Sequence, residues 1–270
     1  MLLTNNLGYP RVGAFRELKK ANEAYWAKKI SAEELLQAGL KIRESNWKTQ
    51  KDAGIELIPS NDFAFYDQVL DLSLTVGAIP ARYNSLLNKI DRQYNLDLYF
   101  AMARGFQEGG VDVTAMEMTK WFDTNYHYIV PEFVKNQEFK LTSEKFLSEY
   151  NEAKQLGIET KPVLIGPITY LLLGKEKEAD FNRIDLIDKL LPVYEEILGK
   201  LADAGAKYVQ IDEPFLALDI DDATKALYGK VFEKLAAAAK GIKLIVATYF
   251  EALGNNEDIA VNLPVHALHL

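Results

Sequence analysis

Three cations near the amino terminus have the spacing of a face that binds an anion. Arg16, Lys19 and Lys20 are three and four positions apart, so in a helix they lie on one face. The preceding residues 5–13 contain Gly and Pro and predict a turn that leads into this helix. A helix start adds free backbone N–H groups and the positive end of the helix dipole. The pattern favours an anionic ligand, and the alternative is a solvated helix face.

Two adjacent acids form a second candidate for chemistry. Asp212 and Glu213 follow a short apolar strand and precede Pro214. At the carboxyl end of a barrel strand, such acids can transfer protons or bind a cation. The alternative is a buried hydrogen-bonding or ion-pairing role at the mouth of the barrel.

The three histidines do not have a metal-binding spacing. A site built on His266 and His269 would need two more ligands, and on a strand their spacing points the side chains to opposite faces. We therefore expect no metal site in this chain. His127 lies between two tyrosines and is expected to pack, with substrate contact as the alternative.

The amino-acid composition restricts the kinds of partner that the chain can bind. The 270 residues carry a net charge of −8, which argues against a nucleic-acid or membrane surface, so we expect neither partner. The absence of cysteine excludes disulfides and thiolate metal sites within the chain and fits a reducing compartment. No apolar run reaches the ~18–20 residues of a membrane span, and the start lacks the features of a signal peptide. We expect a cytoplasmic protein.

Helical and strand patterns alternate along the chain. Residues 31–34 form a capping box, and Pro192 is expected to kink a helix or to open a new one. The pattern predicts helices over 16–29, 31–52, 62–76, 91–104, 143–156, 184–204 and 222–239. It predicts strands over 55–58, 116–122, 163–165, 208–211, 244–247 and 263–270.

This alternation predicts an α/β fold with a parallel sheet of the TIM-barrel type. With the opening counted as a strand, the chain contains about seven strand–helix units, whereas a closed barrel needs eight. We expect residues 1–270 to form one barrel domain that is truncated at its carboxy-terminal end and belongs to a longer chain. Such a barrel has an unpaired strand edge, so the last strand should lie beside a gap, or a neighbouring molecule should fill that gap.

Five segments, in order, carry a family resemblance. The resemblance is to the amino-terminal half of cobalamin-independent methionine synthases. The segments that carry it are the opening, Glu117–Phe133, Gly166–Tyr170, Val209–Pro214 and Ala247–Glu251. These enzymes are 5-methyltetrahydropteroyltriglutamate–homocysteine methyltransferases, and the resemblance covers the whole chain. It implies the amino-terminal barrel of a two-barrel protein whose catalytic zinc domain is absent here.

The resemblance also implies substrate-binding residues. The folate substrate, 5-methyltetrahydropteroyltri-L-glutamate, carries a tail of carboxylates. The tail-binding segment of the family matches Arg16, Glu17, Leu18 and Lys19, and a further family lysine matches Lys120. Arginine can pair bidentately with a carboxylate, and lysine offers a compact charge. Glu17 and Leu18 are expected to contribute backbone N–H groups or packing.

Some of these residues have structural alternatives. Lys120 could instead form an ion pair with Glu117, three residues earlier. Trp121, Tyr126 and Tyr128 could stack on a pterin ring, but we expect them to pack in the core.

The resemblance places the reaction outside this chain. In the family, zinc held by His, Glu and two Cys binds the thiol of L-homocysteine, and no cobalamin takes part. The zinc ligands belong to the carboxy-terminal half, which is the implied partner, so we expect no catalytic residue here and an inactive fragment. For Asp212 and Glu213, the resemblance favours the structural role.

Two alternatives to this assignment stay open. The chain could be a stand-alone, non-catalytic folate-binding or scaffold module, and the natural length of the polypeptide would decide. A weaker alternative is another zinc-dependent thiol methyltransferase barrel, which would lack a glutamate-tail site.

Overall fold

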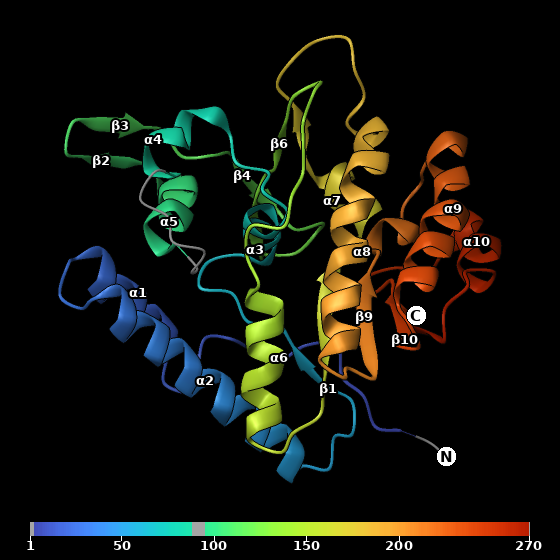
Figure 1. Cartoon of the computed structure of the whole chain (residues 1–270), viewed down its shortest axis with the longest axis horizontal. Coiled ribbons are helices and arrows are strands. Elements are labelled where there is room, and N and C mark those ends of the chain that lie inside the picture. The colour runs from blue at the N-terminus through green and yellow to red at the C-terminus, as the bar shows by residue number, and fades with distance from the viewer. Residues whose placement is uncertain (1–2, 88–94, 270) are drawn as a thin grey trace.

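The centre of the molecule is a parallel β-sheet. The computed structural model describes residues 3–87 and 95–269, and five described strands form the sheet in the order β1-β7-β9-β10-β11 (Figure 1). The strands are β1 Ile58–Ser60, β7 Thr160–Ile165, β9 Tyr208–Asp212, β10 Lys243–Ala247 and β11 Ala267–His269. All neighbouring strands are parallel. The expected α/β fold with a parallel sheet is confirmed.

The sheet is open at both described edges. On one side, Asn5 forms a single parallel bridge with Leu57, next to β1. On the other, β11 pairs only with β10 among the described strands. Among the described strands, the last one therefore lies at an edge of the sheet.

Fewer segments join this sheet than the alternation suggested. The expected strand at 116–122 becomes β4 Met118–Lys120, which pairs in antiparallel fashion with β5 His127–Ile129 outside the main sheet. Its pattern identified a strand but not the partner, and the nearby β5 closes a hairpin at a small entropic cost. Two further small pairs are β2 Phe106–Glu108 with β3 Val111–Val113, and β6 Glu132–Phe133 with β8 Lys175–Glu176.

Helices surround the sheet and form a separate arm. The arm contains α1 and α2, which cross the lower left of Figure 1, while α8 and α9 pack side by side along the sheet. The bounds are α1 Glu17–Trp26, α2 Ala32–Asp52, α3 Gln68–Thr75, α4 Asn84–Leu87, α5 Leu96–Arg104, α6 Lys145–Gln155, α7 Pro167–Leu173, α8 Ile187–Asp203, α9 Asp222–Ala238 and α10 Glu257–Val261. None of the described helices is long and apolar enough to cross a membrane.

Several expected boundaries moved for identifiable reasons. The capping box at Ser31 is present, and Pro192 lies inside α8 without ending it. The helix expected from residue 62 begins at Gln68, because the Asp67 carboxylate accepts from the N–H groups of Val69 and Leu70. The strand expected over 55–58 lies at 58–60. The start of the helix expected at 91 falls outside the described residues, and α5 begins at Leu96.

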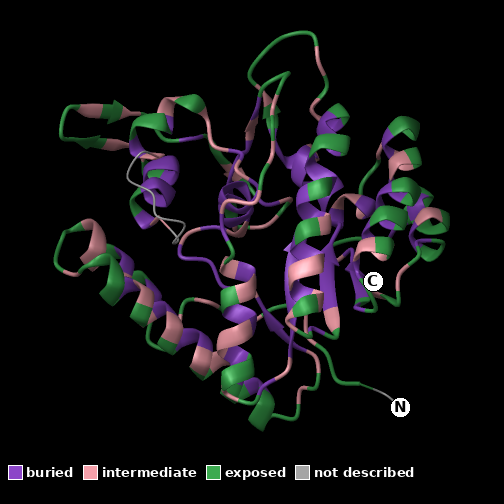
Figure 2. Cartoon of the chain, in the orientation of Figure 1, coloured by how far each residue is buried: buried purple, intermediate pink, exposed green. Residues whose placement is uncertain are grey.

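The interior has two large hydrophobic clusters. One joins the sheet to α7, α8 and α9 and includes Leu190, Val209 and Phe232. The other joins α2, α3 and α5 to the start of α1 and includes Leu18 and Tyr99. Figure 2 shows the central strands of the main sheet mostly buried, whereas the outer faces of the helices are exposed.

Candidate functional site

The opening segment is held to the sheet before it enters α1. The side chain of Gln210 on β9 donates to the carbonyl of Leu7 at 3.1 Å. The N–H of Tyr9 donates to the Asp62 carboxylate at 2.8 Å. The chain then turns at Gly13 (φ 80°) and at Arg16 (φ 61°). These contacts place the start of α1 at a fixed position relative to the barrel.

The four residues of the matched segment divide into two pairs. Arg16 is the N-cap of α1 and is exposed. Lys19 is also exposed, and among the described residues its one ion pair is with Glu23 at 3.5 Å. In contrast, the Glu17 carboxylate accepts from the N–H of Phe15 at 2.9 Å, and Leu18 is 4% exposed in the core. Two cations therefore face solvent, while Glu17 and Leu18 shape and anchor the turn.

The helix start also offers backbone donors. In the described part of the chain, no backbone or side-chain acceptor binds the N–H groups of Glu17 and Lys19. The N–H of Leu18 donates to the carbonyl of Val12 at 3.2 Å. The first turn of α1 thus carries two free N–H groups beside two cations, an arrangement that suits an anion.

Lys120 lies on a different element, which contacts the opening. It is exposed on β4, opposite His127 of β5. Next to His127, the Tyr126 hydroxyl accepts from Arg11 Nη1 at 2.6 Å, and this contact joins the hairpin to the opening segment. The alternative ion pair of Lys120 with Glu117 does not form, because Glu117 pairs with Lys175 at 2.6 Å.

Two cavities flank the start of α1. The first, of about 330 Å³, is lined by Arg11, Leu18 and Lys19 together with residues of α1 and the loop before α3. The second, of about 440 Å³, lies between the opening turn and α2 and is lined by Glu17 and Lys41 among others. The matched segment therefore separates two hollows of a size that suits parts of a small ligand.

The adjacent acids occupy opposite sides of the end of β9. The Glu213 carboxylate accepts from the N–H groups of Ile168 and Thr169 at the start of α7, and burial raises the pKa of Glu213 to about 7. Asp212 accepts from Gln210 and from the Tyr249 hydroxyl, and burial raises the pKa of Asp212 to about 6. Both carboxylates are held by protein donors, which is the structural role that the resemblance favours.

The residues of this chain do not fit a zinc site. Across residues 3–87 and 95–269, no three His, Cys, Asp or Glu side chains come close enough together to hold a metal ion. The chain contains no cysteine, which the ligand set implied by the resemblance requires. His127 is exposed, so the expectation that it packs is wrong, and its Nδ1 lies 3.1 Å from the carbonyl of Asn125.

The aromatic residues near Lys120 belong mainly to the core. Trp121 is 4% and Tyr128 is 6% exposed, which agrees with the expected packing role. Tyr126 is half-buried, and both its hydroxyl and its ring contact Arg11, with the guanidinium 5.0 Å from the ring centre. Arg11 is a residue that the spacing argument missed, although a lone cation inside a Gly/Pro turn was a visible signal.

Comparison with known proteins decides the family. The family model described as "Cobalamin-independent synthase, N-terminal domain" matches residues 3–270. This chain belongs to the cobalamin-independent synthase family. The part that it matches is the amino-terminal domain.

Relatives within the cobalamin-independent synthase family are similar over nearly the whole chain. The 5-methyltetrahydropteroyltriglutamate–homocysteine methyltransferase of Flavobacterium johnsoniae is 62% identical over 267 residues, which are 99% of this chain and 34% of the relative. The enzyme of that name from Saccharomyces cerevisiae is 50% identical over 98% of this chain and 35% of its own length. The chain thus spans about a third of the length of these curated relatives.

Solved structures related to cobalamin-independent synthases share the fold. A putative vitamin-B12-independent methionine synthase from Listeria monocytogenes aligns with a TM-score of 0.63 at 13% identity, covering 98% of this chain and 73% of that one. A B12-independent methionine synthase from a Shewanella species aligns with a TM-score of 0.53 at 18% identity, covering 87% of this chain and 59% of that one.

Proposed function

We propose that this chain is the amino-terminal part of an enzyme that transfers the methyl group of 5-methyltetrahydropteroyltri-L-glutamate to L-homocysteine. Within it, Arg16, Lys19 and Lys120 bind carboxylates of the glutamate tail, and Glu17 and Leu18 position the turn that presents them. The carboxy-terminal part of the polypeptide supplies zinc and the L-homocysteine site. This assignment rests on family membership and on the reaction named for the relatives.

One observation carries the tail-binding role. Arg16 and Lys19 are exposed at a helix start whose Glu17 and Lys19 N–H groups have no acceptor in the described part of the chain. On a protein of net charge −8, two exposed cations at a helix start, of which Lys19 has only a half-exposed ion pair with Glu23, favour an anionic ligand. A tail with several spaced carboxylates can pair with several cations, whereas a single carboxylate can pair with only one or two.

Calorimetric titration of the 270-residue chain tests the proposal. We expect 5-methyltetrahydropteroyltriglutamate to bind more tightly than the monoglutamate, and its affinity to fall as salt is added. Arg16→Ala and Lys19→Ala should each weaken the binding of the triglutamate by about ten- to a hundredfold, since a hydrogen bond to a charged group contributes about 1.5–3 kcal/mol. The monoglutamate should change less.

A matched control variant distinguishes binding at a specific site from a general effect of the protein's positive charge. Lys48→Ala removes another exposed lysine, on α2, and should leave both affinities unchanged. Equal weakening of both ligands by Arg16→Ala, or equal weakening by Lys48→Ala and Lys19→Ala, would argue against tail binding at the start of α1.

A further inference from the structure

The smaller cavity beside α1 is lined by apolar side chains, including Val12, Leu18 and Phe65, and by a set of charged and polar groups. It measures about 330 Å³, and its polar lining consists of Arg11, Lys19, Asn22, Glu23, Trp26 and Tyr66. Arg16 does not line it, so the cavity is separate from the N-cap of the helix. Its two cations come from different segments, which the fold of the opening brings together.

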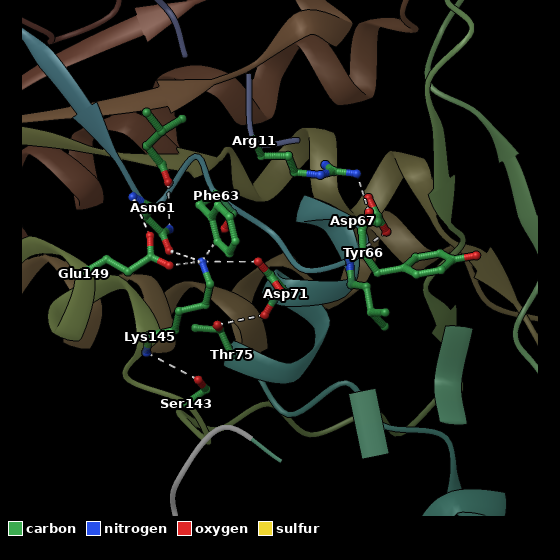
Figure 3. A network of polar contacts seen from close by, with 12 residues as sticks. Arg11, Asn61, Phe63, Tyr66, Asp67, Asp71, Thr75, Ser143, Lys145 and Glu149 are labelled. Atoms are coloured by element: carbon green, nitrogen blue, oxygen red, sulfur yellow. Dashed lines mark hydrogen bonds and ion pairs between the residues drawn. The ribbon is translucent and has the colours of Figure 1, made fainter. Parts of the chain in front are cut away.

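Arg11 is a cation whose partners are all neutral. Its guanidinium donates to the Tyr126 hydroxyl at 2.6 Å and to the carbonyl of Tyr66 at 2.5 Å, the latter drawn in Figure 3. No carboxylate in residues 3–87 or 95–269 forms an ion pair with it. Asp67 lies nearby, but its oxygens accept from the N–H groups of Val69, Leu70 and Ile129. A half-buried guanidinium of this kind favours an anion on its open side.

Two other groups of the wall lack partners. The Asn22 side chain is 6% exposed, and its Nδ2 donates to the carbonyl of Phe65 at 2.7 Å, which orients the amide. The Asn22 Oδ1 atom is therefore an acceptor, and it is buried without a donor in the described part of the protein. The Trp26 Nε1 atom is buried there without an acceptor. Unpaired buried polar groups destabilise a protein, so a complementary ligand gains from pairing them.

We infer that this cavity binds one γ-linked glutamyl unit of the substrate tail. Arg11 and Lys19 take its carboxylate, Asn22 Oδ1 accepts from its amide N–H, and Trp26 Nε1 donates to its amide carbonyl. The inference rests on the proposed function, and it adds Arg11, Asn22 and Trp26 to the residues that match the family. Glu23 competes only weakly for Lys19, because both side chains of their 3.5 Å pair are about half exposed.

The test uses the intact chain and two probes, 5-methyltetrahydropteroyltriglutamate and free tri-γ-L-glutamate. We expect Trp26→Phe to weaken both probes by about tenfold, because it removes the N–H and keeps the ring. The melting temperature should stay within ~2 °C, since the lost donor has no partner in the described part of the protein. Arg11→Gln should weaken both probes more than Arg11→Lys does, since lysine keeps the charge.

Trp47→Phe is the matched control. Trp47 Nε1 donates to the carbonyl of Pro59 at 3.1 Å, far along α2, so this variant should lower the melting temperature and leave the affinities unchanged. If Trp26→Phe lowered the melting temperature and left both affinities unchanged, the role of Trp26 would be purely structural.

The outcomes separate this inference from the proposed function. If Arg16→Ala abolishes tail-dependent binding while Trp26→Phe and Arg11→Gln bind as the wild type does, the cavity inference is wrong and the tail site at the helix start stands. If Trp26→Phe and Arg11→Gln weaken binding while Arg16→Ala does not, the cavity stands and Arg16 is not a tail-binding residue. If the wild type binds neither probe, both proposals are wrong.

Discussion

At the scale of single residues, Lys161 shows how the sheet handles a buried charge. It lies on β7 with its side chain 1% exposed, and its Nζ atom donates to the Gln210 side chain. Burial lowers the pKa of Lys161 from 10.5 to about 8, and the nearby carboxylates of Asp212 and Asp62 partly oppose this shift. The opening segment is attached to the same group of residues through Leu7 and Tyr9.

The lowered pKa predicts a pH dependence of stability. Between pH 8 and 10.5 the folded protein binds fewer protons at Lys161 than the unfolded chain does, so this lysine contributes more stability as the pH rises. The difference in free energy of unfolding between wild type and Lys161→Met should grow by ~2 kcal/mol from pH 8 to 10. Urea unfolding at several pH values measures it.

The exposed lysine Lys207 provides the control for this series. Lys207→Met should keep a constant offset from the wild type over the same range. A wild-type advantage over Lys161→Met that shrinks toward pH 10 would contradict the predicted direction.

At the scale of elements, α7 is fixed by the acid that follows β9. Glu213 accepts from the N–H of Thr169 at 2.9 Å and from its hydroxyl at 2.6 Å. Gly166, the N-cap of α7, leaves the space for this carboxylate, because a Cβ there would overlap Glu213 Oε1. Glycine is required at this position because the Glu213 carboxylate approaches the backbone closely, and not because the φ angle is positive.

This contact predicts opposite effects for two glycine substitutions. Gly166→Ala should destabilise the protein by about 2–3 kcal/mol, because the methyl group overlaps the buried carboxylate. Gly229→Ala, inside α9 with open space around the added Cβ, should stabilise it by about 0.5–1 kcal/mol. Thermal unfolding of both variants measures this, and equal effects would refute the overlap argument.

At the scale of the whole molecule, a buried ion network joins the two hydrophobic clusters. Lys145 at the start of α6 pairs with Glu149 at 2.9 Å and with Asp71 of α3 at 3.3 Å, and it donates to the carbonyl of Phe63 at 2.6 Å (Figure 3). Arg43 of α2 binds Glu152 on the same helix, α6, at 2.7 Å. The Arg43–Glu152 pair thereby holds α2 against α6.

Removing the central cation should therefore weaken the whole fold. Lys145→Met leaves Asp71 and Glu149 without this cation at a site where all three side chains are 11% exposed or less, so we expect a loss of about 3–5 kcal/mol. Lys189→Met breaks an exposed pair with Glu138 and should cost about 0–1 kcal/mol. Denaturant unfolding compares the two, and a similar small loss in both would show that the network does not support the fold.

Local features of the chain could be read from its sequence. The capping box at Ser31, the apolar stripe of α8 and the buried strands at 163–165, 208–211 and 244–247 follow from residue spacing, which backbone geometry dictates. The order of short motifs was sufficient to identify the family, and the family model matches residues 3–270. The cations Arg16, Lys19 and Lys120 were selected in the same way, and their binding role stays a prediction.

Only the tertiary structure decided which distant groups meet. Spacing identified β4 as a strand but could not show that it pairs with β5 outside the main sheet. Arg11 and Tyr126 are 115 positions apart, and their contact, like the cavity beside α1, exists only because the fold closes that distance. Local periodicity determines secondary structure because it reflects geometry within a few residues, whereas partners, burial and pKa shifts depend on packing between segments that the sequence keeps far apart.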